Sequence, residues 1–218
     1  MTHAYISDTI EPVYFVSFMP RRNLMKKIFA LLTIVFGFST AAQAGLLIEP
    51  YLGYYYGTTI SRGVTSSIDV TDTSTGLGYG LRLGYKFMVP WVAIDYSASS
   101  GTNETDYPPG TANVDYAWTG IGVSVGADLP LGLRIFGGYG FTDKAVLKYT
   151  SGDDTLTGSY TKVGLGFRLI PMLSLNAEYI MHSYTKYDNG TTKVDLDTVY
   201  SSFSSNAVLV SISAPLNL

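Results

Sequence analysis

The chain has 218 residues, a formal net charge of −3 and no cysteine. Disulfides, thiolate–metal sites and cysteine nucleophiles are therefore excluded, and the acidic balance gives no support for nucleic-acid binding. Only 14% of the residues are charged, against about 25% in an average soluble domain, so a soluble protein of this composition would lack the charge to cover its surface. The 18 tyrosines suit a membrane–water boundary, because each combines an apolar ring with a polar tip.

Residues 25–44, MKKIFALLTIVFGFSTAAQA, have the order of a secretory signal peptide. Lys26 and Lys27 precede an apolar run over 28–38, and the segment ends in the small-x-small pattern AQA. This order predicts cleavage after Ala44. The alternative, a transmembrane helix, requires about 20 apolar residues, and this run is too short for it.

Residues 1–24 show no recognisable organisation. We expect them to be an N-terminal extension upstream of the true start at Met25. The mature protein is then residues 45–218, which follow the extension and the signal peptide, and we predict that they form one domain.

Residues 76–87, GLGYGLRLGYKF, show the clearest regular pattern in this domain. Every second position is large and apolar, whereas the positions between hold glycine, Arg82 and Lys86. A period of two is that of a β-strand, and a helical period would mix the same residues around the axis. Eight segments have this alternation, each long enough for a membrane-spanning strand of about 9–11 residues: 48–57, 76–87, 91–99, 118–128, 133–142, 160–169, 173–184 and 206–218.

The connections between these segments alternate in length. Three are short turns, at 88–90, 128–132 and 170–172, and four are long and polar, at 58–75, 99–113, 143–159 and 185–205. Short periplasmic turns and long outer loops are typical of outer-membrane barrels. The sequence therefore predicts an all-β fold, an eight-stranded antiparallel up-and-down transmembrane β-barrel that is apolar outside and polar inside.

Charged residues test the assignment of the two faces. A cation on the lipid face costs about 2–4 kcal/mol at the bilayer midplane, so charged residues should fall on the face opposite the large apolar ones. A soluble β-sandwich or lipocalin-like barrel would reverse the two faces, and alternation alone does not exclude it. Eight charged residues of these segments lie opposite the apolar face, and none of them lies on it: Glu49, Arg82, Lys86, Asp95, Arg134, Lys162, Arg168 and Glu178.

These residues form the candidate interior of the barrel, with five cations against three anions. An eight-stranded barrel has just enough interior for side chains to fill it, and neighbouring glycines leave room for long side chains. We therefore expect a structural charge network that plugs the interior. The alternative is a narrow pore for ions or small solutes, in which the same residues line the channel and the net positive interior favours anions.

Four segments carry a resemblance to a known family: PYLGYYYG (50–57), GLRLGYKF (80–87), TKVGLGFRL (161–169) and LSLNAEY (173–179). Through these four segments, residues 45–218 resemble the OmpA-type barrels and the wider outer membrane protein beta-barrel domain family. The resemblance implies a monomer in the cell outer membrane with loops at the cell surface, contact with outer-membrane lipids and lipopolysaccharide, and insertion by the barrel-assembly machinery. That family usually ends in phenylalanine, whereas this chain ends in Leu218 with Pro215 inside the last segment.

Some small barrels are lipid-modifying enzymes that use histidine, serine and a carboxylate near the outer rim. His182 is the one histidine after residue 44, and the adjacent Ser183 points to the opposite face of a strand. We therefore predict no catalytic residues and expect His182 to be a rim residue near the loops.

No cofactor or metal site is predicted either, since no spacing matches a calcium loop. The acidic residues of the long connections are expected to keep the loops soluble: Asp69, Asp72, Glu104, Asp106, Asp153, Asp154, Asp188, Asp195 and Asp197.

The leading hypothesis is a structural or surface-interaction protein with a plugged barrel and four extracellular loops. A narrow pore is the second hypothesis, and a lipid A-modifying enzyme is the third.

Overall fold

The computed structural model describes residues 45–65, 68–107 and 110–218, with the side chain of Tyr107 left out. The predicted extension and signal peptide, residues 1–44, lie outside the described residues. The main strands are β1 Gly45–Gly63, β2 Val70–Lys86, β3 Pro90–Tyr107, β4 Gly110–Asp128, β5 Leu133–Tyr149, β6 Gly152–Ile170, β7 Leu173–Asp188 and β9 Tyr200–Ser213. The short elements are η1 Pro130–Gly132, β8 Lys193–Asp195, α2 Leu196–Val199 and β10 Leu216–Asn217.

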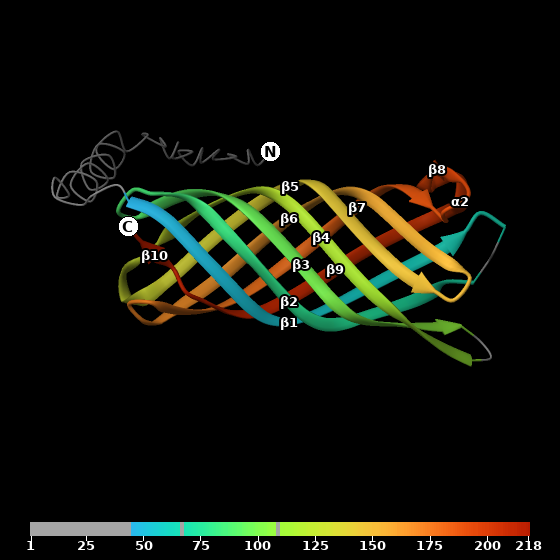
Figure 1. Ribbon diagram of the computed structural model, residues 1–218, viewed down its shortest axis with the longest axis horizontal. Helices are drawn as coiled ribbons and strands as arrows, with labels where there is room; N and C mark the ends of the chain where they lie inside the picture. The colour runs from blue at the N-terminus through green and yellow to red at the C-terminus, as the bar shows by residue number, and fades with distance from the viewer. Residues whose placement is uncertain (1–44, 66–67, 108–109) are drawn as a thin grey trace, which may run out of the picture. The chain divides into compact units, whose positions relative to one another are not determined.

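The eight main strands close into a ring (Figure 1). Each pairs antiparallel with the next in chain order from β1 to β7, and β9 pairs with both β7 and β1. Closure removes the free sheet edges, so the backbone groups of the ladder are bonded within the ring. The predicted eight-stranded up-and-down barrel is therefore confirmed, with β8 and β10 as short additions to its ends. No helix within the described ranges is long and apolar enough to cross a membrane.

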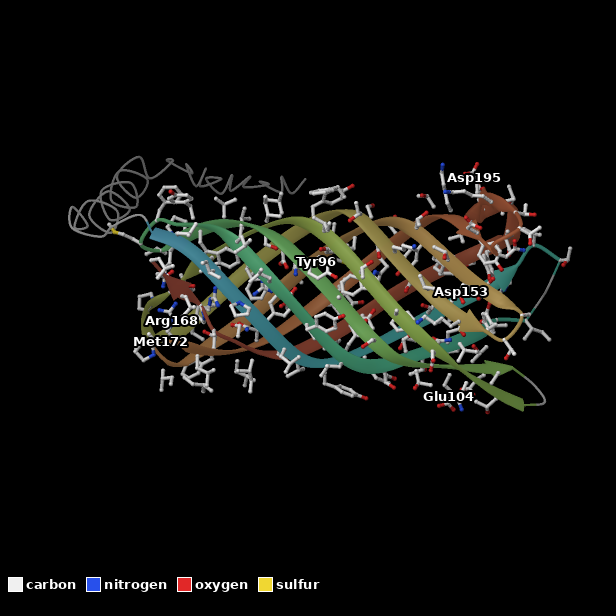
Figure 2. All side chains as sticks on the ribbon, in the orientation of Figure 1. Tyr96, Glu104, Asp153, Arg168, Met172 and Asp195 are labelled. Carbon is white, nitrogen blue, oxygen red and sulfur yellow. The ribbon has the colours of Figure 1, made fainter. Side chains whose placement is uncertain are left out.

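The two faces of the barrel wall have opposite chemistry (Figure 2). Large apolar side chains lie outside, with Leu165 67% exposed and Ile94 61% exposed, whereas Glu49, Arg82 and Asp95 are 0% exposed. A protein that hides its charges and exposes its apolar residues is suited to a lipid solvent. The soluble alternative, with apolar residues inside, is wrong for this chain.

The barrel has two distinct ends. The short connections lie at one end, here called the turn end. The first and last described residues, Gly45 and Leu218, also lie at this end. The backbone N–H of Leu46 donates to the Leu218 carbonyl there at 2.9 Å. Arg168 and Met172 mark this end in Figure 2, and Asp153 and Asp195 mark the opposite end, here called the hairpin end.

The strands extend much farther toward the hairpin end than the sequence analysis predicts. The prediction of long polar loops at 58–75, 99–113, 143–159 and 185–205 is wrong for most of their length, because β1 to β7 have 16 to 19 residues each. Threonine, serine and asparagine replace many of the apolar residues on the outer face there, and β-branched threonine is well suited to a strand that faces water. The change of outer residue runs from Ile121 to Thr119, Val163 to Thr161, Met181 to Ser183 and Val208 to Asn206.

Three β-bulges interrupt the ladder toward the hairpin end. Ile121 pairs with Thr142 while Gly122 pairs with Gly140, so β5 contains one extra residue. One extra residue reverses the alternation of a strand, because side chains repeat with a period of two. Asp143 and Tyr149, beyond this bulge, therefore face the interior.

The bulges of β7 and β9 have the same effect. Thr185 is the extra residue of β7, and Tyr187 turns inward beyond it. Ser201 is the extra residue of β9, and Tyr200 turns inward beyond it. Hydroxyl groups support all three bulges: Thr142 Oγ1 accepts from the Ile121 N–H at 2.9 Å, Thr185 Oγ1 donates to the Thr157 carbonyl at 3.4 Å, and Ser201 Oγ donates to the Arg62 carbonyl at 3.2 Å.

Candidate functional site

A network of ion pairs fills the half of the barrel nearer the turn end. Arg82 of β2 is its centre: its guanidinium contacts Asp95 at 3.0 Å, Glu49 at 3.2 Å and Glu178 at 2.5 Å. The rings of Tyr51 and Phe136 each lie 4.6 Å from the Arg82 Cζ atom. These contacts reach Arg82 from β1, β3, β5 and β7, so one side chain links four other strands.

Further pairs cross the interior between strands that are not neighbours. Arg134 of β5 binds Glu49 of β1 through two hydrogen bonds of 2.7 and 2.9 Å, although β1 and β5 lie on opposite sides of the ring. Lys162 of β6 likewise crosses the interior to Asp95 of β3 at 2.7 Å, and it also contacts Glu178 of the neighbouring strand β7 at 2.9 Å. A planar guanidinium that holds both oxygens of one carboxylate is a strong and directional contact.

Asp128 anchors the network at the turn end, and the sequence analysis missed it. It accepts from Arg134 Nε at 2.9 Å, and it also pairs with Lys86 and Arg168. The sequence analysis placed Asp128 where segment 118–128 meets the turn 128–132 and did not include it in the charged interior set. All eight residues predicted to form the interior network are brought together, although Lys86 and Arg168 keep side-chain exposures of 13% and 26%.

The predicted excess of positive charge inside the barrel is wrong. Asp128 and Asp143 add to the three predicted carboxylates, so the Arg and Lys side chains do not outnumber the carboxylates in the described interior. The charge argument for anion preference therefore does not hold.

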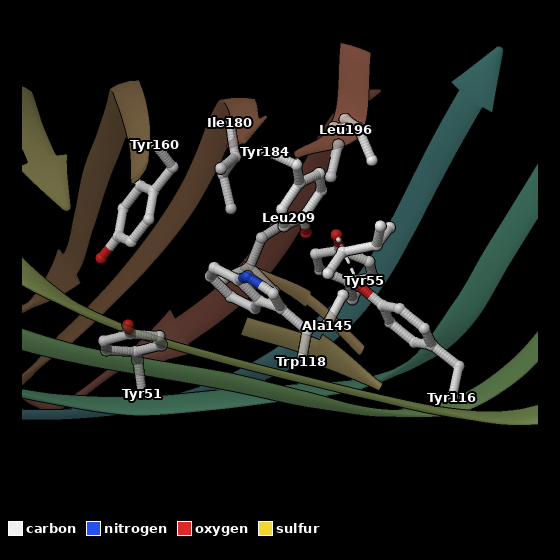
Figure 3. Packing of buried hydrophobic residues seen from close by; sticks show 12 residues of the cluster. Tyr51, Tyr55, Tyr116, Trp118, Ala145, Tyr160, Ile180, Tyr184, Leu196 and Leu209 are labelled. Atoms are coloured by element: carbon white, nitrogen blue, oxygen red, sulfur yellow. Dashed lines mark hydrogen bonds between the residues drawn. The ribbon is translucent and has the colours of Figure 1, made fainter. Parts of the chain in front are cut away.

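Aromatic side chains fill the next layer toward the hairpin end (Figure 3). Trp118 is 1% exposed, and its ring lies 5.7 Å from that of Tyr55 and 5.6 Å from that of Tyr160. The Trp118 indole N–H donates to Asp143 at 2.6 Å. Ile180 and Leu209 fill the space beside the rings and are 0% and 1% exposed.

His182 lies inside this aromatic layer, so its predicted place at the rim near the loops is wrong. The His182 side chain is 1% exposed, and its Nδ1 lies 2.8 Å from Asp143 Oδ2. Its Nε2 lies 3.2 Å from the Tyr55 hydroxyl. Ser183, the serine beside it, is exposed on the outer face. His182 is not at the rim because β7 and the adjacent strand β6 continue beyond it. Its partner Asp143 faces inward because of the bulge of β5, since simple alternation from Arg134 would turn Asp143 outward.

A cavity of about 80 Å³ lies beyond the aromatic layer, toward the hairpin end. We call it the vestibule. Buried Tyr55, Tyr116 and Tyr184 form its floor, and the more exposed Tyr149, Tyr187, Tyr200 and Phe203 line its outer part together with Asp72 and Asp154.

Electrostatic effects connect the outer tyrosines of the vestibule with its two carboxylates. Burial raises the pKa of Tyr149 above its ordinary value, and Asp154 and Asp72 raise it further. Burial also raises the pKa of Tyr187, and Asp154 raises it further. Asp72 and Asp154 were assigned to soluble loops, but both line the interior of the extended strands. Across residues 45–65, 68–107 and 110–218, no three His, Asp or Glu side chains are grouped to hold a metal ion.

Comparisons with known proteins agree with this architecture. The chain matches the outer membrane protein beta-barrel domain family over residues 29–204. No curated protein matches it. A similar solved structure is that of Ail, the attachment invasion locus protein of Yersinia pestis, in complex with the heparin analogue sucrose octasulfate: 12% identity, a TM-score of 0.50, and coverage of 79% of this chain and 99% of Ail. Another is the outer membrane protein AlkL in lipid bilayers, at 14% identity, a TM-score of 0.50, and coverage of 83% and 94%.

Proposed function

Because the chain belongs to the outer membrane protein beta-barrel domain family, we propose that it is a non-conducting barrel of the cell outer membrane that serves as a structural or surface-interaction protein. The membrane part anchors the hairpin end at the cell surface, and that end makes the contacts. We propose outer-membrane lipids and lipopolysaccharide as its surroundings, insertion by the barrel-assembly machinery, and a monomeric state.

The observation that carries this proposal is the double hydrogen bond from Arg134 to Glu49 across the ring. It is supported by Arg82, whose guanidinium holds three carboxylates and is 0% exposed. Ions that pass this level would have to displace side chains that are mutually neutralised. Separating a buried ion pair leaves both charges uncompensated in a low-dielectric interior, so we expect the plug to be closed nearly all of the time.

Planar-bilayer conductance tests the proposal. The protein is purified from outer membranes after expression of the full chain, and Arg134→Ala and Arg62→Ala variants are measured beside it. Arg62 is the matched control, because its side chain is 45% exposed and pairs with Asp69 at the hairpin end. We expect no discrete channels from the wild type or from Arg62→Ala. Steady openings of the wild type whose ion preference changes in Arg134→Ala would establish the pore instead.

We also propose that the barrel has no enzymatic activity. A lipid hydrolase needs a nucleophile within hydrogen-bond reach of its base, whereas the neighbours of the His182 ring nitrogens are Asp143, Tyr55 and Tyr184. The rings of Trp118 and Tyr184 pack against the His182 imidazole. We expect that neither the purified wild type nor His182→Ala hydrolyses lipid A. Hydrolysis by the wild type that is lost in His182→Ala would contradict the proposal.

A further inference from the structure

The geometry points to a binding site for an organic ammonium group, a protonated amine or a quaternary ammonium, in the vestibule. This inference rests on the proposed function in one respect, namely that the hairpin end makes the surface contacts. It names the chemistry of those contacts.

The first argument is unmatched negative charge. Asp72 accepts from Asn103 Nδ2 at 3.1 Å and from the Thr105 hydroxyl, and Asp154 lines the same cavity. Both donors to Asp72 are neutral. None of the described residues that line the vestibule is lysine, arginine or histidine. A low-dielectric hollow lined by one sign of charge concentrates ions of the opposite sign, so the vestibule favours cations.

The second argument is the aromatic lining. Tyr200 and Phe203 have ring centroids 5.4 Å apart, and Tyr184 and Phe203 have ring centroids 6.0 Å apart, so rings from β7 and β9 form a continuous wall. The face of an aromatic ring attracts a cation, most strongly where water is excluded. Rings together with carboxylates recognise organic ammonium groups better than small, strongly hydrated metal ions, which require several oxygen ligands.

The third argument is that three separate irregularities build the lining. Tyr149, Tyr187 and Tyr200 each lie beyond a bulge on their own strand. Without the bulges, all three side chains would point away from the interior. Bulges often re-aim side chains at functional sites, and a wall that only had to stay closed would gain nothing from three of them.

The size of the vestibule limits the ligand. A cavity of about 80 Å³ holds a few non-hydrogen atoms, whereas sites for drug-sized ligands measure about 300–1,000 Å³. The site therefore takes an ammonium head group, and the remainder of the ligand extends past Tyr149 and Tyr187 into solvent.

The test compares choline with its neutral isostere 3,3-dimethylbutan-1-ol. Wild-type protein is purified in a maltoside detergent, because phosphocholine and amine-oxide detergents would themselves compete. Binding is followed through tyrosine ring signals by NMR. We expect choline to shift the vestibule tyrosines and to bind at least about tenfold more tightly than the isostere, since only choline carries the charge.

Variants locate the site. Asp154→Asn should weaken choline binding about tenfold, because one carboxylate is lost. Asp153→Asn is the matched control: it changes the net charge equally at the adjacent residue, which is exposed and outside the vestibule lining. Tyr187→Phe keeps the ring and should bind within about twofold of the wild type, whereas Tyr187→Leu should bind about fivefold more weakly. Heat-dependent mobility on gels verifies that every variant is folded.

Three results would each overturn the inference. One is no choline-dependent shift in the wild type. Another is equal affinity for choline and the isostere, or a neutral sugar that binds where choline does not. The last is an equal loss of binding in Asp153→Asn and Asp154→Asn. The test is independent of conductance, so a barrel that conducts and still binds choline would reject the proposed function and keep this site.

Discussion

Toward the turn end, the buried carboxylates of the network lie within hydrogen-bond distance of a guanidinium or ammonium nitrogen. Toward the hairpin end, Asp72 accepts from neutral Asn103 and Thr105, and Asp72 and Asp154 line a cavity whose described lining holds no lysine, arginine or histidine. Both groups lie inside the same barrel wall. An unmatched charge is costly deep in a low-dielectric interior and much cheaper near water. Matched charges are thus suited to holding strands together, and unmatched charges near the surface are suited to meeting a ligand.

Removing a matched charge should have the largest effect on stability. Arg82→Met leaves Glu49, Asp95 and Glu178 without their shared guanidinium, and we expect it to lower the free energy of unfolding by about 3–5 kcal/mol. Urea titration of folding into lipid vesicles measures the change. Arg62→Met at the exposed hairpin end should leave the midpoint unchanged. If Arg82→Met were as stable as the wild type, the network would not be what holds the turn end closed.

The aromatic layer between the two regions should show an intermediate effect. Trp118→Phe removes the indole N–H that donates to Asp143 and leaves one carboxylate oxygen buried without that donor. Trp91→Phe is the matched control, because the Trp91 indole nitrogen is buried without a hydrogen-bond partner. The first substitution should cost about 1–3 kcal/mol more than the second. Equal unfolding midpoints in the same urea titration would show that Asp143 does not depend on Trp118.

The smallest effect is expected at the hairpin end, as a shift in titration. Burial and Asp154 raise the pKa of Tyr187, so folding favours its neutral form. This contribution to stability is present below the ordinary tyrosine pKa of about 10 and is lost as the pH rises through the higher value of the folded state. Asp154→Asn should move the pKa of Tyr187 back toward its ordinary value. Titration of ¹³C-labelled tyrosine measures the pKa of Tyr187, and Tyr187→Phe assigns its signal. An unchanged pKa of Tyr187 in Asp154→Asn would show that Asp154 does not raise it.

Alternation was enough to predict the closed barrel and the residues Glu49, Arg82, Asp95, Arg134, Lys162 and Glu178 at its centre. Those residues lie in stretches where the period of two is unbroken and one face is apolar. Toward the hairpin end polar and apolar residues mix on both faces of the wall, so the sequence pattern no longer separates strand from loop.

The residues missed by the sequence analysis have identifiable reasons. Asp128 lies at the end of a strand next to a turn, where face assignment does not extend. Asp143, Tyr149, Tyr187 and Tyr200 lie beyond bulges, and each bulge reverses the face that simple counting gives. The available signal is the hydroxyl residue at each bulge, Thr142, Thr185 or Ser201, but threonine and serine are too common here to mark a bulge by themselves.

The closure of β1 against β9 has a consequence for how the molecule assembles. Tyr51 pairs with Ser213, so the seam joins the two ends of the barrel sequence, and contacts between distant parts of a chain form late and slowly. Glu49 lies on the strand at this seam and meets Arg134 on the far side of the ring. The β1–β9 ladder and the Arg134–Glu49 ion pair therefore both depend on β1. A sheet that has not closed lacks this ladder, so we expect a chain stalled at that stage to expose two strand edges.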